Sequence, residues 1–174
     1  MVPIIAALFA GILAGQAVTP APAAANCPVG AAASDALPAE LKGWSALQGV
    51  TAGSSMAMPA TLAIGRSARA TLIPTGDVSY PLAPERAAEA GSSGGIFAFD
   101  VTSAGLYRVA LGTAAWVDVL AGGKTVTSVA HGHGPDCSGV RKYVDFRVQP
   151  GRYLVQVSGN KTPTLTLMVA RVEG

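Results

Sequence analysis

The chain has little charge, and its N-terminal part has none. Only 13% of the 174 residues are charged, and no Lys, Arg, Asp or Glu precedes Asp35. Twelve basic against ten acidic side chains give a net charge of +2, and the basic residues form no cluster. Proteins that bind nucleic acids neutralise phosphates with clustered Lys and Arg. Nucleic-acid binding is therefore excluded.

Residues that commonly carry chemistry are also scarce. The sequence holds two cysteines and two histidines, and 6% of its residues are aromatic. It contains no Gly-x-Ser-x-Gly nucleophile motif, no P-loop and no dinucleotide-binding glycine motif. We therefore predict no catalytic residue. Half of the residues are apolar, which suffices to fill the core of one small domain and argues against low-complexity disorder.

An uninterrupted apolar run occupies residues 4–14 near the N-terminus. At about 1.5 Å per residue this run cannot cross a hydrocarbon layer of roughly 30 Å. It is followed by small residues at 23–25, as in a secretory signal peptide with its cleavage site. We predict that residues 1–25 are a cleaved signal peptide, with 15–17 as a second candidate cleavage site. The mature protein is then periplasmic or secreted and has no transmembrane span.

Both cysteines, Cys27 and Cys137, belong to the predicted mature chain. Two thiols in an exported protein usually form a disulfide. We therefore predict a Cys27–Cys137 bridge. Closing a loop of about 110 residues contributes roughly 4–5 kcal/mol in the chain-entropy model. Such a bridge is structural and leaves Cys137 neither a nucleophile nor a metal ligand.

Residues 26–59 are rich in Ala, Gly, Ser and Pro. This composition predicts an extended N-terminal segment that wraps the domain. Only residues 37–44 combine a helix-start signal with apolar side chains, so we predict a short helical turn there. Trp44 is expected to anchor the segment.

Residues 60–174 show alternation of apolar and polar side chains, the pattern of strands with one buried face. Gly, Pro and Asn separate the alternating stretches. The pattern predicts an all-β domain of eight or nine strands, an antiparallel β-sandwich or jelly roll. The alternating apolar residues are Ala68, Ala70 and Leu72; Phe97, Phe99 and Val101; Tyr107, Val109 and Leu111; Val144, Phe146 and Val148; Tyr153, Val155 and Val157; and Leu165, Leu167 and Val169.

Two hairpins repeat one motif. Gly105-x-Tyr107 and Gly151-x-Tyr153 each follow an apolar strand and open another. Glycine permits the tight turn, and the tyrosine two residues later can pack inward while its hydroxyl contacts the backbone of the corner. We therefore predict two equivalent hairpins in facing sheets.

The motifs of residues 97–172 resemble the β-sandwich modules of bacterial secreted enzymes, namely pre-peptidase C-terminal domains and jelly-roll carbohydrate-binding modules. The motifs that carry the resemblance are Phe97-x-Phe99-x-Val101, the two Gly-x-Tyr hairpins and Trp116-Val-Asp118-Val-Leu. The resemblance implies an exported, non-catalytic accessory or binding module. Its partner would be a glycan or another cell-envelope component, and it would need no cofactor.

The best candidate ligand-binding residues are Trp116, Asp118 and Tyr143. If Val117 and Val119 face the core, Trp116 lies outward beside Asp118 and can stack on a sugar ring. If the strand is buried on both faces, Trp116 belongs to the core instead. Tyr143 begins a second polar face that continues with two charged residues, Asp145 and Arg147, which can pair with each other or with a neighbouring strand.

His131-Gly-His133 is the main candidate for metal chemistry, because histidines two apart on a strand share a face and can bind one divalent ion. The motif resembles the opening of the metal site of cupins, a group that includes the non-haem iron homogentisate dioxygenases. Cys137 or Ser138 occupies the place of the expected Glu, and Asp136 is the nearby carboxylate. The alternative function is thus a cupin-like metal-dependent enzyme with His131, His133 and Asp136 as ligands. In the other interpretation the histidines hydrogen-bond locally in a glycine-rich connection.

Overall fold

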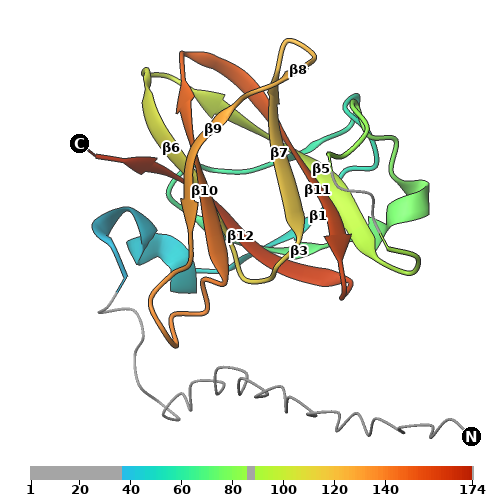
Figure 1. Ribbon diagram of the computed structural model, residues 1–174, viewed down its shortest axis with the longest axis horizontal. Helices are drawn as coiled ribbons and strands as arrows, with labels where there is room; N and C mark the ends of the chain where they lie inside the picture. The colour runs from blue at the N-terminus through green and yellow to red at the C-terminus, as the bar shows by residue number, and fades with distance from the viewer. Residues whose placement is uncertain (1–36, 86–88, 174) are drawn as a thin grey trace, which may run out of the picture.

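The computed structural model describes residues 37–85 and 89–173 (Figure 1). The predicted signal peptide and Cys27 lie outside these residues, so the signal peptide and the Cys27–Cys137 disulfide stay predictions. None of the helices within 37–85 and 89–173 has the length and apolar character needed to cross a membrane.

Twelve strands form within the described residues, and nine of them have four or more residues. Two 3-10 helices, η2 (Ala39–Ser45) and η3 (Thr75–Asp77), accompany them. The strands are β1 (Gln48–Thr51), β2 (Ala60–Thr61), β3 (Ser67–Thr71), β4 (Ile73–Pro74), β5 (Ser93–Val101), β6 (Gly105–Leu111), β7 (Trp116–Ala121), β8 (Lys124–Thr125), β9 (Ser128–Gly132), β10 (Lys142–Val148), β11 (Gly151–Asn160) and β12 (Thr164–Val172).

The strands form two sheets. Sheet 1 has the order β1-β3-β12-β6-β10-β9, and sheet 2 has the order β2-β5-β11-β7-β8 with β4 also paired to β5. Both sheets are mixed, whereas the sequence predicts antiparallel pairing throughout. β1 runs parallel to β3 and β2 parallel to β5, and the other pairs are antiparallel. The parallel strands come from long N-terminal connections and not from hairpins, which produce antiparallel pairs.

The two sheets share one hydrophobic core, as in a sandwich. Alternate residues of the long strands of both sheets enter it, and these are the residues that the alternation predicts to be apolar and buried. The rings of Phe99 and Tyr153 stack in this core with centroids 5.4 Å apart. The mostly-β architecture is therefore shown by the structure.

A second apolar cluster covers the outer face of sheet 1. η2 packs Leu41 and Trp44 against Met168 and Ala170 of β12. The predicted helical turn at 37–44 is thus observed as a 3-10 helix, and Trp44 is buried as expected. The hydroxyl of Ser67 donates to the carbonyl oxygen of Trp44 at 2.7 Å, which fixes the turn to β3.

The two Gly-x-Tyr motifs form the expected tyrosine corners, but the prediction that they are hairpins is wrong. β5 does not pair with β6, nor β10 with β11, and each motif instead joins a strand of one sheet to a strand of the other. The Tyr107 hydroxyl donates to the carbonyl oxygen of Ser103 at 3.0 Å, and the Tyr153 hydroxyl to that of Gln149 at 2.9 Å. Both rings lie in the shared core. The first corner leads from β5 of sheet 2 to β6 of sheet 1, and the second from β10 of sheet 1 to β11 of sheet 2, so both cross between the sheets.

Candidate functional site

A pocket of about 620 Å³ lies where the edges of the two sheets meet. Strands β9 and β10 of sheet 1 form one wall, and β7 and β8 of sheet 2 form the other (Figure 1). Its lining mixes aromatic, charged, hydroxyl and apolar side chains: Glu85, Trp116, Val117, Asp118, Thr125, Val126, Thr127, Ser128, His131, Gly132, His133, Lys142, Tyr143, Val144 and Phe146. The pocket brings together the predicted ligand-binding residues and both histidines.

The wall from sheet 2 is the edge of β7. β8 pairs with β7 only at Leu120 and Ala121, and the next contact is the backbone N–H of Val126, which donates to Val119. Because no other described strand pairs with this edge at 116–118, the pocket reaches both faces of β7. Val117 lies on the inner face, while Trp116 and Asp118 lie on the outer face.

The indole of Trp116 is held by a short chain of hydrogen bonds. Its Nε1 donates to Asp118 Oδ1 at 2.9 Å, and Nε2 of Gln156 donates to Asp118 Oδ2 at 2.8 Å. Asp118 is 6% exposed and Gln156 is 2% exposed. Two charge-assisted bonds in a buried setting fix the carboxylate, and through it the ring. β7 is therefore buried over much of both faces, which is the alternative given above for this strand. Trp116 nevertheless reaches the pocket.

Gln156 is a residue that sequence reasoning missed. It lies on β11 directly opposite Asp118 in the strand register. The alternation of Tyr153, Val155 and Val157 places it on the outer face, which is the available sequence signal. Its pairing with Asp118 depends on the cross-strand register, which the sequence does not show.

The wall from sheet 1 presents His131 toward the gap between the sheets. His131 pairs in register with Val144, and Ser128 with Phe146. Directly opposed residues of an antiparallel pair point to the same face. Because Val144 and Phe146 face the shared core, His131 and Ser128 project from the inner face of β9. His131 is nevertheless exposed to solvent.

The predicted metal ligands do not converge. Within 37–85 and 89–173, no group of three or more His, Cys, Asp or Glu residues is placed to hold a metal ion. His131, His133 and Asp136 are not brought together as such a group among these residues, and metal binding by them stays a prediction. Asp136 lies in the turn between β9 and β10 and does not line the pocket. A hydrogen bond from the backbone N–H of Ser138 to the carbonyl oxygen of Pro135 closes this turn.

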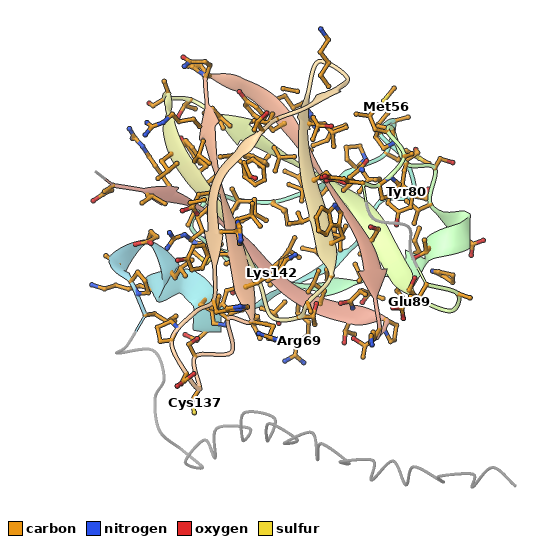
Figure 2. The ribbon with its side chains drawn as sticks, viewed as in Figure 1. Met56, Arg69, Tyr80, Glu89, Cys137 and Lys142 are labelled. Carbon is orange, nitrogen blue, oxygen red and sulfur yellow. The ribbon has the colours of Figure 1, made fainter. Side chains whose placement is uncertain are left out.

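His133 instead makes local hydrogen bonds. Its Nδ1 lies 2.8 Å from the carbonyl oxygen of Arg141 and 3.2 Å from Nη1 of the same residue. A protonated Nδ1 donates to the carbonyl, and an unprotonated one accepts from the guanidinium. Cys137 follows in the same connection and is labelled at the lower left of the domain in Figure 2. His133 thus has the local hydrogen bonds of the alternative in which the histidines belong to a glycine-rich connection.

Two residues of β10 complete the pocket. The Nζ of Lys142 lies 5.4 Å from the centre of the Trp116 ring, within range of a cation–π contact. Tyr143 lies over Gly132 of β9, where a Cβ atom would be 2.6 Å from the tyrosine hydroxyl oxygen. A glycine at 132 therefore lets the aromatic ring cover the edge strand.

Behind Tyr143, a buried charged cluster fixes β10. Arg108 donates from Nε and Nη2 to the two carboxylate oxygens of Asp145 at 2.8 and 2.9 Å, and from Nη1 to Glu40 at 2.7 Å. Its guanidinium carbon is 3.8 Å from the centre of the Tyr143 ring. Asp145 thus pairs with the neighbouring strand β6 and not with Arg147. The hydrogen bonds to Asp145 raise the pKa of Arg108 above its usual value, although burial opposes the shift.

Comparisons with protein-family models, with curated proteins and with solved structures find no match to this chain. The resemblance to secreted β-sandwich modules stays a prediction. The functional argument consequently rests on the pocket.

Proposed function

We propose that the protein is an exported, non-catalytic binding module that holds a glycan of the cell envelope in the pocket between β7 and β9. The observation that carries the proposal is the Trp116 indole, fixed by Asp118 and Gln156 at the wall of a 620 Å³ pocket. A jelly-roll fold and a periplasmic or secreted location belong to the same proposal. The alternating strands and the apolar N-terminal run support them.

The chemistry of the lining suits a sugar. An aromatic ring offers a flat apolar surface to the C–H face of a pyranose, and Trp116 and Tyr143 both line the pocket. Hydroxyl groups of Thr125, Thr127 and Ser128 and the imidazole of His131 supply donors and acceptors for sugar hydroxyls. Ligand pockets of roughly 300–1,000 Å³ commonly combine such apolar walls with a few fixed polar groups.

A glycan array probed with the purified mature protein tests the proposal. We expect binding to a restricted set of glycans and its loss in Trp116→Ala. Trp116→Phe, which keeps a ring but removes the N–H that Asp118 accepts, should bind with intermediate affinity. Val129→Ala, on β9 but outside the pocket lining, is the control and should bind normally. An array without any bound glycan, or a Trp116→Ala protein that binds like the parent, contradicts the proposal.

Metal analysis of the same protein tests the alternative function. Iron or manganese at one equivalent, lost in His131→Ala, would support a metal-dependent enzyme and count against a binding module.

A further inference from the structure

The inner end of the pocket is continuous with the hydrophobic core. Val117 and Phe146 belong to the shared core and are 6% and 3% exposed. Val126 and Val144 are partly buried and pack against it. These four side chains line the pocket from both sheets, so a ligand that enters fully would touch the interior of the sandwich.

The gap exists because the edge strands do not close it. Inner-face residues at the edge of a sandwich normally pack on the opposite sheet. Here Ser128 and His131 of β9 point inward yet remain exposed. The facing strand β8 has two residues and does not extend along β7 to Trp116. The space between β7 and β9 is therefore open to solvent at one side and apolar at its base.

Polar groups of the pocket gather at its outer part. Trp116 is partly exposed, with its N–H bonded to the buried Asp118, and the partly exposed Lys142 reaches toward the same indole. His131 and Ser128 come from the exposed edge strand. The pocket thus has a polar rim and an apolar base. A free sugar carries hydroxyl groups around its ring and would leave some of them without partners against the valines.

We propose that the ligand is amphipathic, with an alkyl or acyl chain inserted between the sheets and its polar head at the rim. The chain contacts Val117, Val126, Val144 and Phe146. The head occupies the site next to Trp116, and in this respect the inference rests on the proposed glycan-binding function. Each methylene buried at the base adds about fourfold to the affinity.

Fluorescence titration with N-phenyl-1-naphthylamine, whose emission rises in apolar surroundings, tests the inference on the purified protein. We expect saturable enhancement, displaced by octyl β-glucoside below its micelle concentration and not by methyl β-glucoside. Hexyl β-glucoside should displace the probe about fifteenfold more weakly than the octyl compound, since it is shorter by two methylenes.

Paired variants test where the alkyl chain of the ligand binds. Val126→Glu should abolish probe binding, because it places a charge at the apolar base. Val129→Glu introduces the same charge on β9 at a side chain that is 52% exposed and should leave binding unchanged. Val144→Thr, a smaller change, should weaken probe binding severalfold and serves if Val126→Glu does not fold.

The outcomes separate this inference from the proposed function. Absent saturable enhancement, displacement independent of chain length, or equal effects of the two Glu variants would overturn the amphipathic ligand. Glycan binding on the array with no response to alkyl chains overturns this inference alone. If displacement of the probe depends on alkyl chain length but the protein binds no glycan, the apolar base of the pocket is supported and the glycan-binding proposal is refuted.

Discussion

Arg108 contacts three side chains at once on the outer face of sheet 1. It joins Glu40 of η2, Asp145 of β10 and the ring of Tyr143, which lines the pocket. Asp145 is 3% exposed, so both charges are largely removed from water and depend on each other. The hydrogen bonds to Asp145 raise the pKa of Arg108 in the folded state, so the stabilising charge is present below the usual arginine pKa and is lost only as the pH rises through the raised one. The pair therefore persists at physiological pH.

Asp145→Asn should lower the free energy of unfolding by about 3 kcal/mol, because it removes the bidentate one of the two carboxylates that pair with the largely buried guanidinium of Arg108. Urea denaturation measures the change. Asp100→Asn is the matched control, since Asp100 and Arg152 form an ion pair of 3.4 Å whose side chains are 59% and 56% exposed. That substitution should cost about 0–1 kcal/mol. Equal losses in the two variants would show that burial of the Arg108 pair does not matter.

Asp118→Ala should lower the free energy of unfolding by about 2 kcal/mol, since it leaves the donors of Trp116 and Gln156 without their acceptor. It should also change the emission of Trp116, measured in a Trp44→Phe background that leaves a single indole. Asp136→Ala, at an exposed carboxylate outside the pocket, should alter neither quantity. An unchanged Trp116 emission in Asp118→Ala would refute the positioning role of the carboxylate.

At the scale of elements, the two tyrosine corners differ in one hydrogen bond. Tyr107 donates once, to Ser103, whereas the Tyr153 hydroxyl donates to the carbonyl oxygen of Gln149 and also accepts from its backbone N–H at 3.1 Å. Both rings are buried in the core. The two corners are therefore a matched pair that differs in its hydrogen bonds.

Tyr107→Phe should cost about 1 kcal/mol of unfolding free energy, and Tyr153→Phe about 2 kcal/mol, because one and two hydrogen bonds are lost while the buried ring is kept. Parallel urea titrations of the two variants measure the difference. If Tyr107→Phe lowers the free energy of unfolding as much as Tyr153→Phe or more, the second hydrogen bond of Tyr153 does not add stability.

Strand prediction succeeded where an element carries its own pattern. β5, β6, β10, β11 and β12 each alternate strictly enough to show their buried face. β1 was not predicted as a strand and lies in the segment predicted to be extended. Its four residues have mostly exposed side chains and therefore show no alternation. The pairing of such a strand depends on its neighbour β3 and not on its own composition.

In the molecule as a whole, two apolar clusters lie on opposite faces of the same strands. β12 sends Leu167 and Val169 into the shared core, while Met168 and Ala170 contact η2 on the outer face. Because both faces belong to the same strand, β12 couples the packing of η2 on sheet 1 to the shared core. The described part should unfold in one step.

Leu41→Ala tests this coupling. Leu41 is 1% exposed, and truncation of a buried leucine should lower the free energy of unfolding by about 3 kcal/mol. In a Trp116→Phe background, which leaves Trp44 as the single indole, circular dichroism and Trp44 emission should still give one coincident transition in urea. Leu47→Ala, at a leucine that is 40% exposed, should change the stability by less than about 1 kcal/mol. An early separate loss of the Trp44 signal would show that η2 unfolds independently.

The sequence by itself determined the strands, their inward faces and the two tyrosine corners, because alternation and turn chemistry act between residues close in the chain. It also named Trp116, Asp118, Tyr143 and the two histidines, all of which line one pocket. Only the tertiary structure joined Gln156 to Asp118 and Arg108 to Asp145, left Asp136 outside the pocket that the histidines line and opened the space between β7 and β9. Those features depend on cross-strand register and on where edge strands end, and both are set by contacts between residues far apart in the chain.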